Sequence, residues 1–145
     1  MKILLLALST LCFVSLPTTS HAQLASLAGR WKNVNSSARN LTKIQIDVEP
    51  TVSVHAFGAC SPTDCDLGSV GALAYAPAAG ASLVDKAMAI TAQYDFGFSE
   101  VRIVIHRLGA RRLKVETLTH FKDGSGRTDY FQVDTMRPLK KNETF

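Results

Sequence analysis

The sequence has few of the features that build helical bundles or catalytic sites. No segment of the 145 residues carries apolar side chains at helical spacing over several turns, so a helical domain is not expected. The Gly-x-Ser-x-Gly, His-Glu-x-x-His and phosphate-loop patterns are absent, and no spacing groups the histidines with carboxylates for catalysis. We therefore expect a protein that is not an enzyme, and keep an enzyme of unknown type as the weakest alternative.

Charge of one sign and long apolar runs are also scarce. The chain has 16 basic and 12 acidic residues, a formal charge of +4, which by itself implies neither nucleic acid nor membrane as a partner. The one long apolar run, Ile3 to Leu16, follows Lys2 and precedes small residues that end at Ala22. This order is typical of a secretory signal peptide, and the run is short for a membrane span. We expect a signal peptide over residues 1–22, no transmembrane span, and a secreted or periplasmic protein.

Cysteine is rare, which limits the chemistry of the most unusual stretch, HAFGACSPTDCDLG at residues 55–68. Cys12 lies in the predicted signal peptide, so Cys60 and Cys65 are the remaining pair. Two cysteines this close in an exported chain predict a disulfide. A zinc site would need both thiols reduced, and a redox site usually has a C-x-x-C at a helix start. We expect neither a metal nor another cofactor.

The polar residues around this cysteine pair have structural interpretations. Asp64 and Asp66 are typical of side chains that stabilise turns. His55 lies opposite Val54 and Ala56 in the alternation of its strand, so we expect it to face solvent as a cross-strand partner. These three residues form a candidate loop site whose role beyond structure the sequence leaves open.

Alternation of apolar and polar residues predicts strands along most of the chain. The clearest examples are LTKIQIDVE from Leu41, SEVRIVIHRL from Ser99 and RRLKVETLTHF from Arg111. In the last segment, Thr117 and Thr119 share a face with Leu113. We predict one all-β, antiparallel domain of about eight strands over residues 23–138, followed by a polar C-terminal tail over residues 139–145. A closed barrel is the leading architecture, and a β-sandwich is the alternative.

Two features at the ends of the predicted sheet favour the barrel. Gly29 and Trp31 form a G-x-W at the first strand, and Arg137 ends the last strand at the parity of Phe131 and Val133, which we expect to face inward. This pattern resembles that of the calycin superfamily, which includes lipocalins, fatty-acid-binding proteins and avidins. The resemblance implies that the arginine covers the tryptophan at one barrel end, although other lipocalin motifs are not evident. Alternatively, Trp31 is simply an aromatic residue of the core.

A second resemblance covers most of the chain after residue 22. The order GRWKNV, TKIQI, HAFGACSPTDCDLG and GSGRTDYFQVDTMRP is similar to a family of small secreted, mostly bacterial proteins without an assigned activity. The loop of that family runs H-x-W-G-x-C-x-P-x-D-C-x-W-G. Phe57 and Leu67 stand here at its two tryptophan positions, so the packing role is kept better than a role that needs an indole.

A basic cluster lies at the turn HRLGARRLK. Its members are His106, Arg107, Arg111, Arg112 and Lys114. Such a cluster is a solvated turn or a surface patch for an anionic surface or a protein partner. Exposed aromatic residues do not alternate with these basic residues, so a nucleic acid is not expected as a partner.

These observations favour a protein that acts by binding. Thr117, Thr119 and the alanines between residues 72 and 92 are small side chains on predicted inward faces, which leaves room in a barrel. The leading hypothesis is an exported barrel that holds a small apolar or amphipathic ligand. The alternative is a secreted interaction module with a solid core that contacts a protein or envelope surface.

Overall fold

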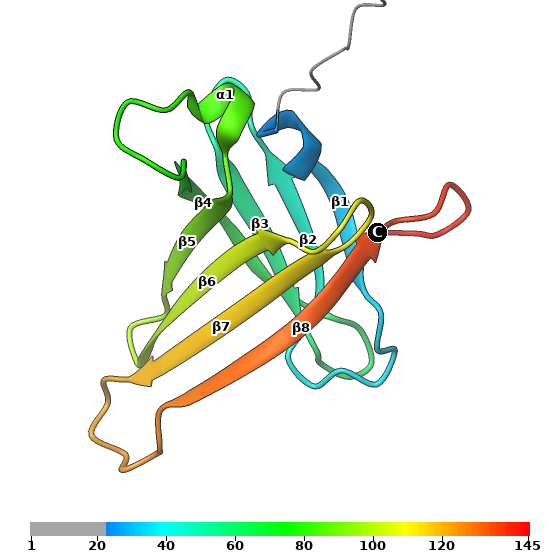
Figure 1. The fold of residues 1–145 in the computed structure, drawn as a ribbon. Coiled ribbons are helices and arrows are strands. Elements are labelled where there is room, and N and C mark those ends of the chain that lie inside the picture. The colour runs from blue at the N-terminus through cyan, green and yellow to red at the C-terminus, as the bar shows by residue number, and fades with distance from the viewer. Residues whose placement is uncertain (1–22) are drawn as a thin grey trace, which may run out of the picture.

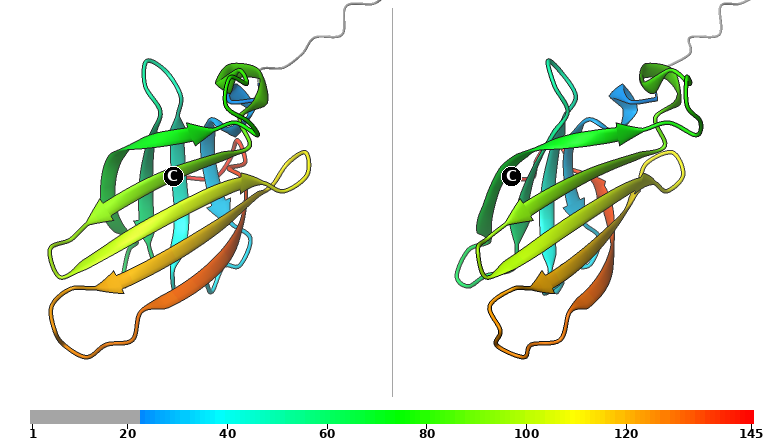
Figure 2. Two further views of the ribbon diagram at one scale, coloured as in Figure 1. Left: turned by 60° about the vertical axis from the view of Figure 1, so that its left-hand side comes forward. Right: turned by 90° about the vertical axis from the view of Figure 1, so that its left-hand side faces the viewer.

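The computed structural model describes residues 23–145, and the predicted signal peptide lies outside the described residues. Eight antiparallel strands form a closed barrel in which each strand pairs with its neighbours in sequence and β1 pairs with β8 (Figures 1 and 2). The strands are β1 (Gly29–Asn33), β2 (Leu41–Asp47), β3 (Ser53–Gly58), β4 (Cys65–Tyr75), β5 (Ala89–Asp95), β6 (Ser99–Arg107), β7 (Leu113–Phe121) and β8 (Tyr130–Pro138). This confirms the predicted all-β barrel over the sandwich.

The core follows the predicted alternation in most strands. Ile44 and Ile46 of β2, Val54 of β3, and Ile103 and Ile105 of β6 are completely buried, while the residues between them face outward. A buried branched side chain contributes roughly 1.5–3 kcal/mol relative to its exposed state. Burial of this inward set therefore fixes the face that each of these strands presents to the interior.

The orientation of β8 differs from the prediction. Phe131 and Val133 are about half exposed, whereas Met136 is completely buried, so the expectation that Phe131, Val133 and Arg137 face inward is wrong. The inward row includes Asp134, whose carboxylate accepts hydrogen bonds from the amide of Asn33 at 2.8 Å and of Asn40 at 3.1 Å. These amide partners offset the cost of placing a carboxylate on the inner face.

One end of the barrel is covered and is called the closed end. A 3-10 helix, η1 (Ala25–Leu27), precedes β1, and Leu27 and Trp31 are both buried there. The indole Nε1 of Trp31 donates to the carbonyl of Leu27 at 3.1 Å. Gly29 between them has φ +115°, a conformation that side-chain-bearing residues rarely adopt, so glycine allows the chain to turn from η1 into β1. The one-turn helix α1 (Leu83–Lys86) lies at the same end (Figure 1).

The C-terminal residues 139–145 fold back onto the barrel. Glu143 accepts a bidentate contact from the guanidinium of Arg137, at 2.6 and 2.7 Å. Phe145 packs edge-on against Phe57, and the guanidinium of Arg30 lies 5.0 Å from the ring centre of Phe145. Arg137 thus faces outward and pairs in register with Lys32, so the predicted contact between Arg137 and Trp31 is wrong.

Candidate ligand-binding site

The end opposite η1 is open and contains a pocket of about 410 Å³, which we call the mouth pocket. All four connections at this end contribute to it, because in an up-and-down barrel every second connection lies at the same end. Its lining includes the apolar side chains of Leu67, Phe96, Phe98, Val101 and Phe121 and the hydroxylated side chains of Ser99, Thr117 and Thr119.

Aromatic side chains form one wall of the mouth pocket. Phe96 and Phe98 stack with ring centres 6.4 Å apart, and the guanidinium of Arg127 lies 4.0 Å from the ring centre of Phe121 and 5.3 Å from that of Phe98. Arg127 is also paired with Asp123, whose pKa is lowered to about 2, mainly by hydrogen bonds from the Ser125 hydroxyl and backbone N–H. The wall is apolar with Arg127 at its edge, and Arg39 also lines the pocket. This arrangement is suited to an amphipathic molecule.

The floor of the mouth pocket is hydroxylated. Ser99, Thr117 and Thr119 are buried, with 3%, 2% and 6% of their surface exposed. Among the described residues, Thr117 Oγ1 is a buried polar atom without a hydrogen-bond partner. An unpaired buried hydroxyl costs about 1–3 kcal/mol, and a bound molecule with a donor or acceptor at this depth would recover it.

The cysteine loop forms the opposite side of the mouth pocket. Cys60 and Cys65 both line it and form a disulfide with Cα atoms 5.3 Å apart, which confirms the predicted pairing. Asp64 between them reaches across the outer face to Lys43, 2.8 Å away, and this hydrogen bond lowers the pKa of Asp64. The loop is therefore fixed both covalently and by an ion pair to β2.

Removing the disulfide should loosen this side of the pocket. A Cys60→Ser/Cys65→Ser variant is expected to lose about 2 kcal/mol of unfolding free energy, the chain-entropy estimate for so short a loop. Urea unfolding of the variant and the unmodified protein measures the difference. A variant of equal stability would contradict the estimate, and reduction of the unmodified protein should reproduce the effect without any substitution.

The other two residues of the predicted loop site lie outside the pocket. His55 Nε2 and Asp66 Oδ1 are 2.6 Å apart on the outer face, where Asp66 also accepts from the backbone N–H of Gly68. The hydrogen bond from His55, followed by that from Gly68, lowers the pKa of Asp66. His55 is thus a cross-strand partner, as its outward parity predicted.

The predicted basic patch divides into three groups. His106 and Lys114 both approach Glu116, at 3.5 and 2.5 Å, and the contact with Lys114 lowers the pKa of Glu116. Arg107 donates to the carbonyls of Ser26 and Ala110, so it joins the β6–β7 connection to η1. The side chains of the two remaining members, Arg111 and Arg112, are exposed.

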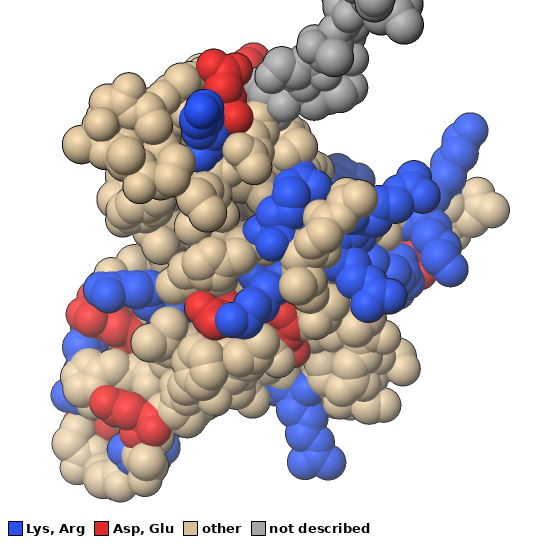
Figure 3. All heavy atoms as spheres, viewed as in Figure 1, with Lys and Arg blue, Asp and Glu red and all other residues tan. Residues whose placement is uncertain are grey.

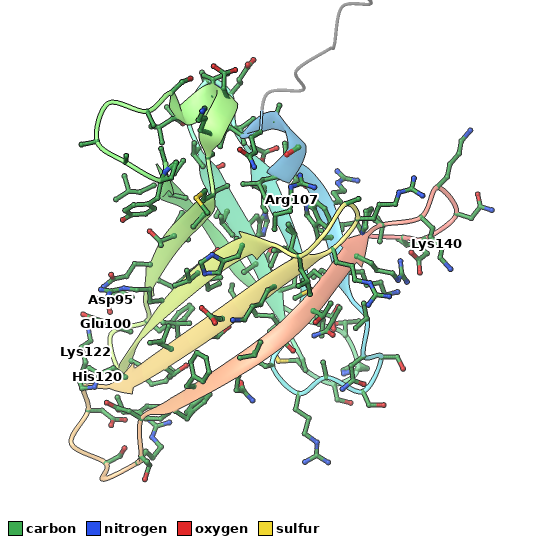
Figure 4. The ribbon with its side chains drawn as sticks, in the orientation of Figure 1. Asp95, Glu100, Arg107, His120, Lys122 and Lys140 are labelled. Atoms are coloured by element: carbon green, nitrogen blue, oxygen red, sulfur yellow. A yellow bond between two sulfur atoms is a disulfide. The ribbon has the colours of Figure 1, made fainter. Side chains whose placement is uncertain are left out.

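The sequence interpretation missed a charged network on the outer face at the open end, visible in Figure 4. Lys122 contacts Asp95 at 2.8 Å and Glu100 at 3.0 Å, which raises the pKa of Lys122, and the contact with Lys122 lowers the pKa of Asp95. His120 and Asp129 form a second pair, 2.6 Å apart. The register of β5, β6 and β7 brings Asp95, Glu100 and Lys122 together, and the β7–β8 connection carries Asp129 back to His120.

No protein-family model and no curated protein matches the chain. Within residues 23–145, no group of three or more histidine, cysteine, aspartate or glutamate side chains could hold a metal ion. No helix in that range has the length and hydropathy required to cross a membrane.

Proposed function

We propose that this protein binds a small amphipathic molecule in the mouth pocket. The observation that carries the proposal is the unpaired, buried hydroxyl of Thr117 in a pocket whose wall is formed by aromatic side chains. A volume of about 410 Å³ falls within the usual range of small-molecule sites. In this arrangement the apolar part of the ligand contacts Phe96 and Phe98, and its polar group pairs with Thr117.

We further propose that the protein binds its ligand without transforming it, and does so outside the cytoplasm. The two histidine–aspartate pairs, at His55 and His120, lie on the outer face rather than among the residues that line the mouth pocket. The Cys60–Cys65 disulfide supports an oxidising compartment, because thiols are kept reduced in the cytosol.

Matched probes test the polar part of this proposal. Naphthalene and 1-naphthol differ by one hydroxyl, and we expect 1-naphthol to bind at a 1:1 ratio and about five- to tenfold more tightly, the value of one hydrogen bond. Thr117→Val should remove the difference, whereas Thr91→Val on the outer face of β5 should keep it. Fluorescence titration measures both affinities.

Two results would contradict the proposal. One is the absence of saturable binding of either probe, together with the absence of a co-purifying small molecule in native mass spectra. The other is saturable binding that Thr117→Val leaves unchanged for both probes, because the hydroxyl would then have no part in recognition.

One observation favours an interaction module as the second candidate function. Leu118, Phe131 and Val133 are 43%, 57% and 50% exposed on neighbouring outward positions of β7 and β8. Apolar side chains that adjoin on a surface often mark a protein contact. This candidate predicts concentration-dependent self-association or capture of a protein partner, and it does not require the mouth pocket.

A further inference from the structure

Basic side chains from three separate segments meet in one groove at the closed end. Arg30 of β1, Arg111 of the β6–β7 connection, and Lys140 and Lys141 of the C-terminal tail line a groove of about 640 Å³. Figure 3 shows lysine and arginine gathered on this side of the molecule, and Figure 4 labels Arg107 and Lys140 there. Arg30 and Lys140 are 110 positions apart in the sequence (140 − 30), and closure of β1 on β8 brings them to one face.

Much of this positive charge is not neutralised by the protein itself. Within residues 23–145, no carboxylate lies within 4.0 Å of the charged groups of four exposed side chains: Arg111, Arg112, Lys140 and Lys141. Glu143, which also lines the groove, is bound to Arg137. An uncompensated cluster of this kind attracts anions over roughly a Debye length, about 8–10 Å at physiological salt.

Exposed aliphatic side chains project from the same end. Leu108 in the β6–β7 connection is 45% exposed, and Val84 of α1 and Met88 after it are each 56% exposed. The segment around η1 joins α1 to the end of β6. The backbone N–H of Leu24 donates to the carbonyl of Val84 at 3.0 Å, and Arg107 donates to the carbonyl of Ser26. The closed end thus combines unpaired cations with exposed apolar side chains.

We propose that the closed end docks on an anionic lipid bilayer. Lysine and arginine beside a negatively charged leaflet each strengthen binding about fivefold, and aliphatic side chains gain by entering the interface between head groups and acyl chains. A soluble acidic partner would use the cations alone and would leave Leu108, Val84 and Met88 in water. The combination of both features at one end therefore favours a membrane surface over an acidic protein or polysaccharide.

This docking is independent of the proposed ligand. The mouth pocket opens at the opposite end of the barrel, so it faces the aqueous phase when the closed end contacts lipid. Loss of the ligand site by substitution at Thr117 leaves the docking surface intact. The two proposals can therefore fail separately.

Vesicle binding of single-residue variants tests the proposal. All variants and the unsubstituted protein are produced and purified in the same way, so they have the same N-terminus. Any contribution of the N-terminus to vesicle binding is then equal in every protein compared. Partitioning is measured by flotation with vesicles of phosphatidylcholine alone or with one-third phosphatidylglycerol. We expect binding to the anionic vesicles only, about fivefold weaker for Arg111→Ala and also weaker for Leu108→Ser. The matched controls Arg102→Ala and Leu118→Ser change exposed residues of β6 and β7 and should leave binding unchanged.

Three outcomes would overturn the proposal. The first is equal binding to both kinds of vesicle, or to neither. The second is an equal loss in the test and control variants, which would place the contact elsewhere. The third is full retention of binding in Leu108→Ser together with equally strong binding to soluble polyglutamate, which would identify an acidic polymer rather than a bilayer as the partner.

Discussion

Replacing Thr117 by phenylalanine should weaken binding of 1-naphthol by at least about 100-fold, a loss of roughly 2.7 kcal/mol. Thr117 lies on the floor of the mouth pocket, so the added ring takes the place of the ligand and removes the hydroxyl that would bind it. The ring has space in a pocket of about 410 Å³, and the barrel is expected to stay folded. Titration of the variant with 1-naphthol gives the result directly.

The control for this prediction is a threonine-to-phenylalanine substitution on the outer face of the barrel. Thr91→Phe changes an outward residue of β5 and should leave the affinity within a factor of two to three, the change that about 0.5 kcal/mol produces. Trp31 is the single tryptophan and lies at the closed end, so its emission reports folding without interference from the pocket. If Thr117→Phe folds and binds 1-naphthol normally, the ligand does not enter the mouth pocket; Thr119→Phe repeats the test should the first variant misfold.

Truncation of Trp31 should have the largest effect on stability. Trp31→Ala is expected to lower the free energy of unfolding by about 3–5 kcal/mol, because it leaves a cavity under η1 and removes the hydrogen bond to Leu27. That loss is a large part of the roughly 5–15 kcal/mol that stabilises a typical domain. Urea unfolding followed by circular dichroism measures it, since the variant lacks tryptophan.

An exposed residue provides the comparison for Trp31. Val133→Ala, on the outer face of β8, should change the unfolding free energy by no more than about 0.5 kcal/mol. A Trp31→Ala protein as stable as Val133→Ala would show that η1 does not close the barrel through this indole. In Trp31→Ala, the backbone amides of η1 are also expected to be the first to lose protection from hydrogen exchange.

Strands in which apolar and polar residues alternate strictly were predictable from the sequence. Such a strand has only one apolar face, and that face must be the buried one. In β6 Ile103 and Ile105, and in β7 Leu113 and Val115, lie at alternate positions and are buried, and Thr117 and Thr119 follow at the same parity. β8 was not predictable in this way. Both faces of β8 carry apolar residues, so alternation does not determine which face points inward. The inward face includes Asp134, whose amide partners Asn33 and Asn40 come from the far end of the chain.

The mouth pocket was predictable only in part, for a related reason. The inward threonines indicated free space, and the cysteine pair indicated a fixed loop. Phe96 and Phe98, however, lie in or beside a short turn, where alternation carries no information about direction. Which barrel end these aromatic side chains cover depends on closure of the sheet. The contact of Arg137 with Glu143 likewise depends on a tail that folds back after the last strand.

The ladders of the barrel differ greatly in length, and this difference determines where the wall can yield. β6 and β7 are joined by nine residue pairs, but β1 and β2 by four, β4 and β5 by four, and β1 and β8 by three. Local opening draws on the least protected hydrogen bonds, so we expect the barrel to behave as two stiffer sheets, β2–β4 and β5–β8, that yield at the β4–β5 ladder and on both sides of β1. The disulfide loop and the aromatic wall belong to different sheets, and the mouth can therefore widen to admit a molecule without breaking any long ladder.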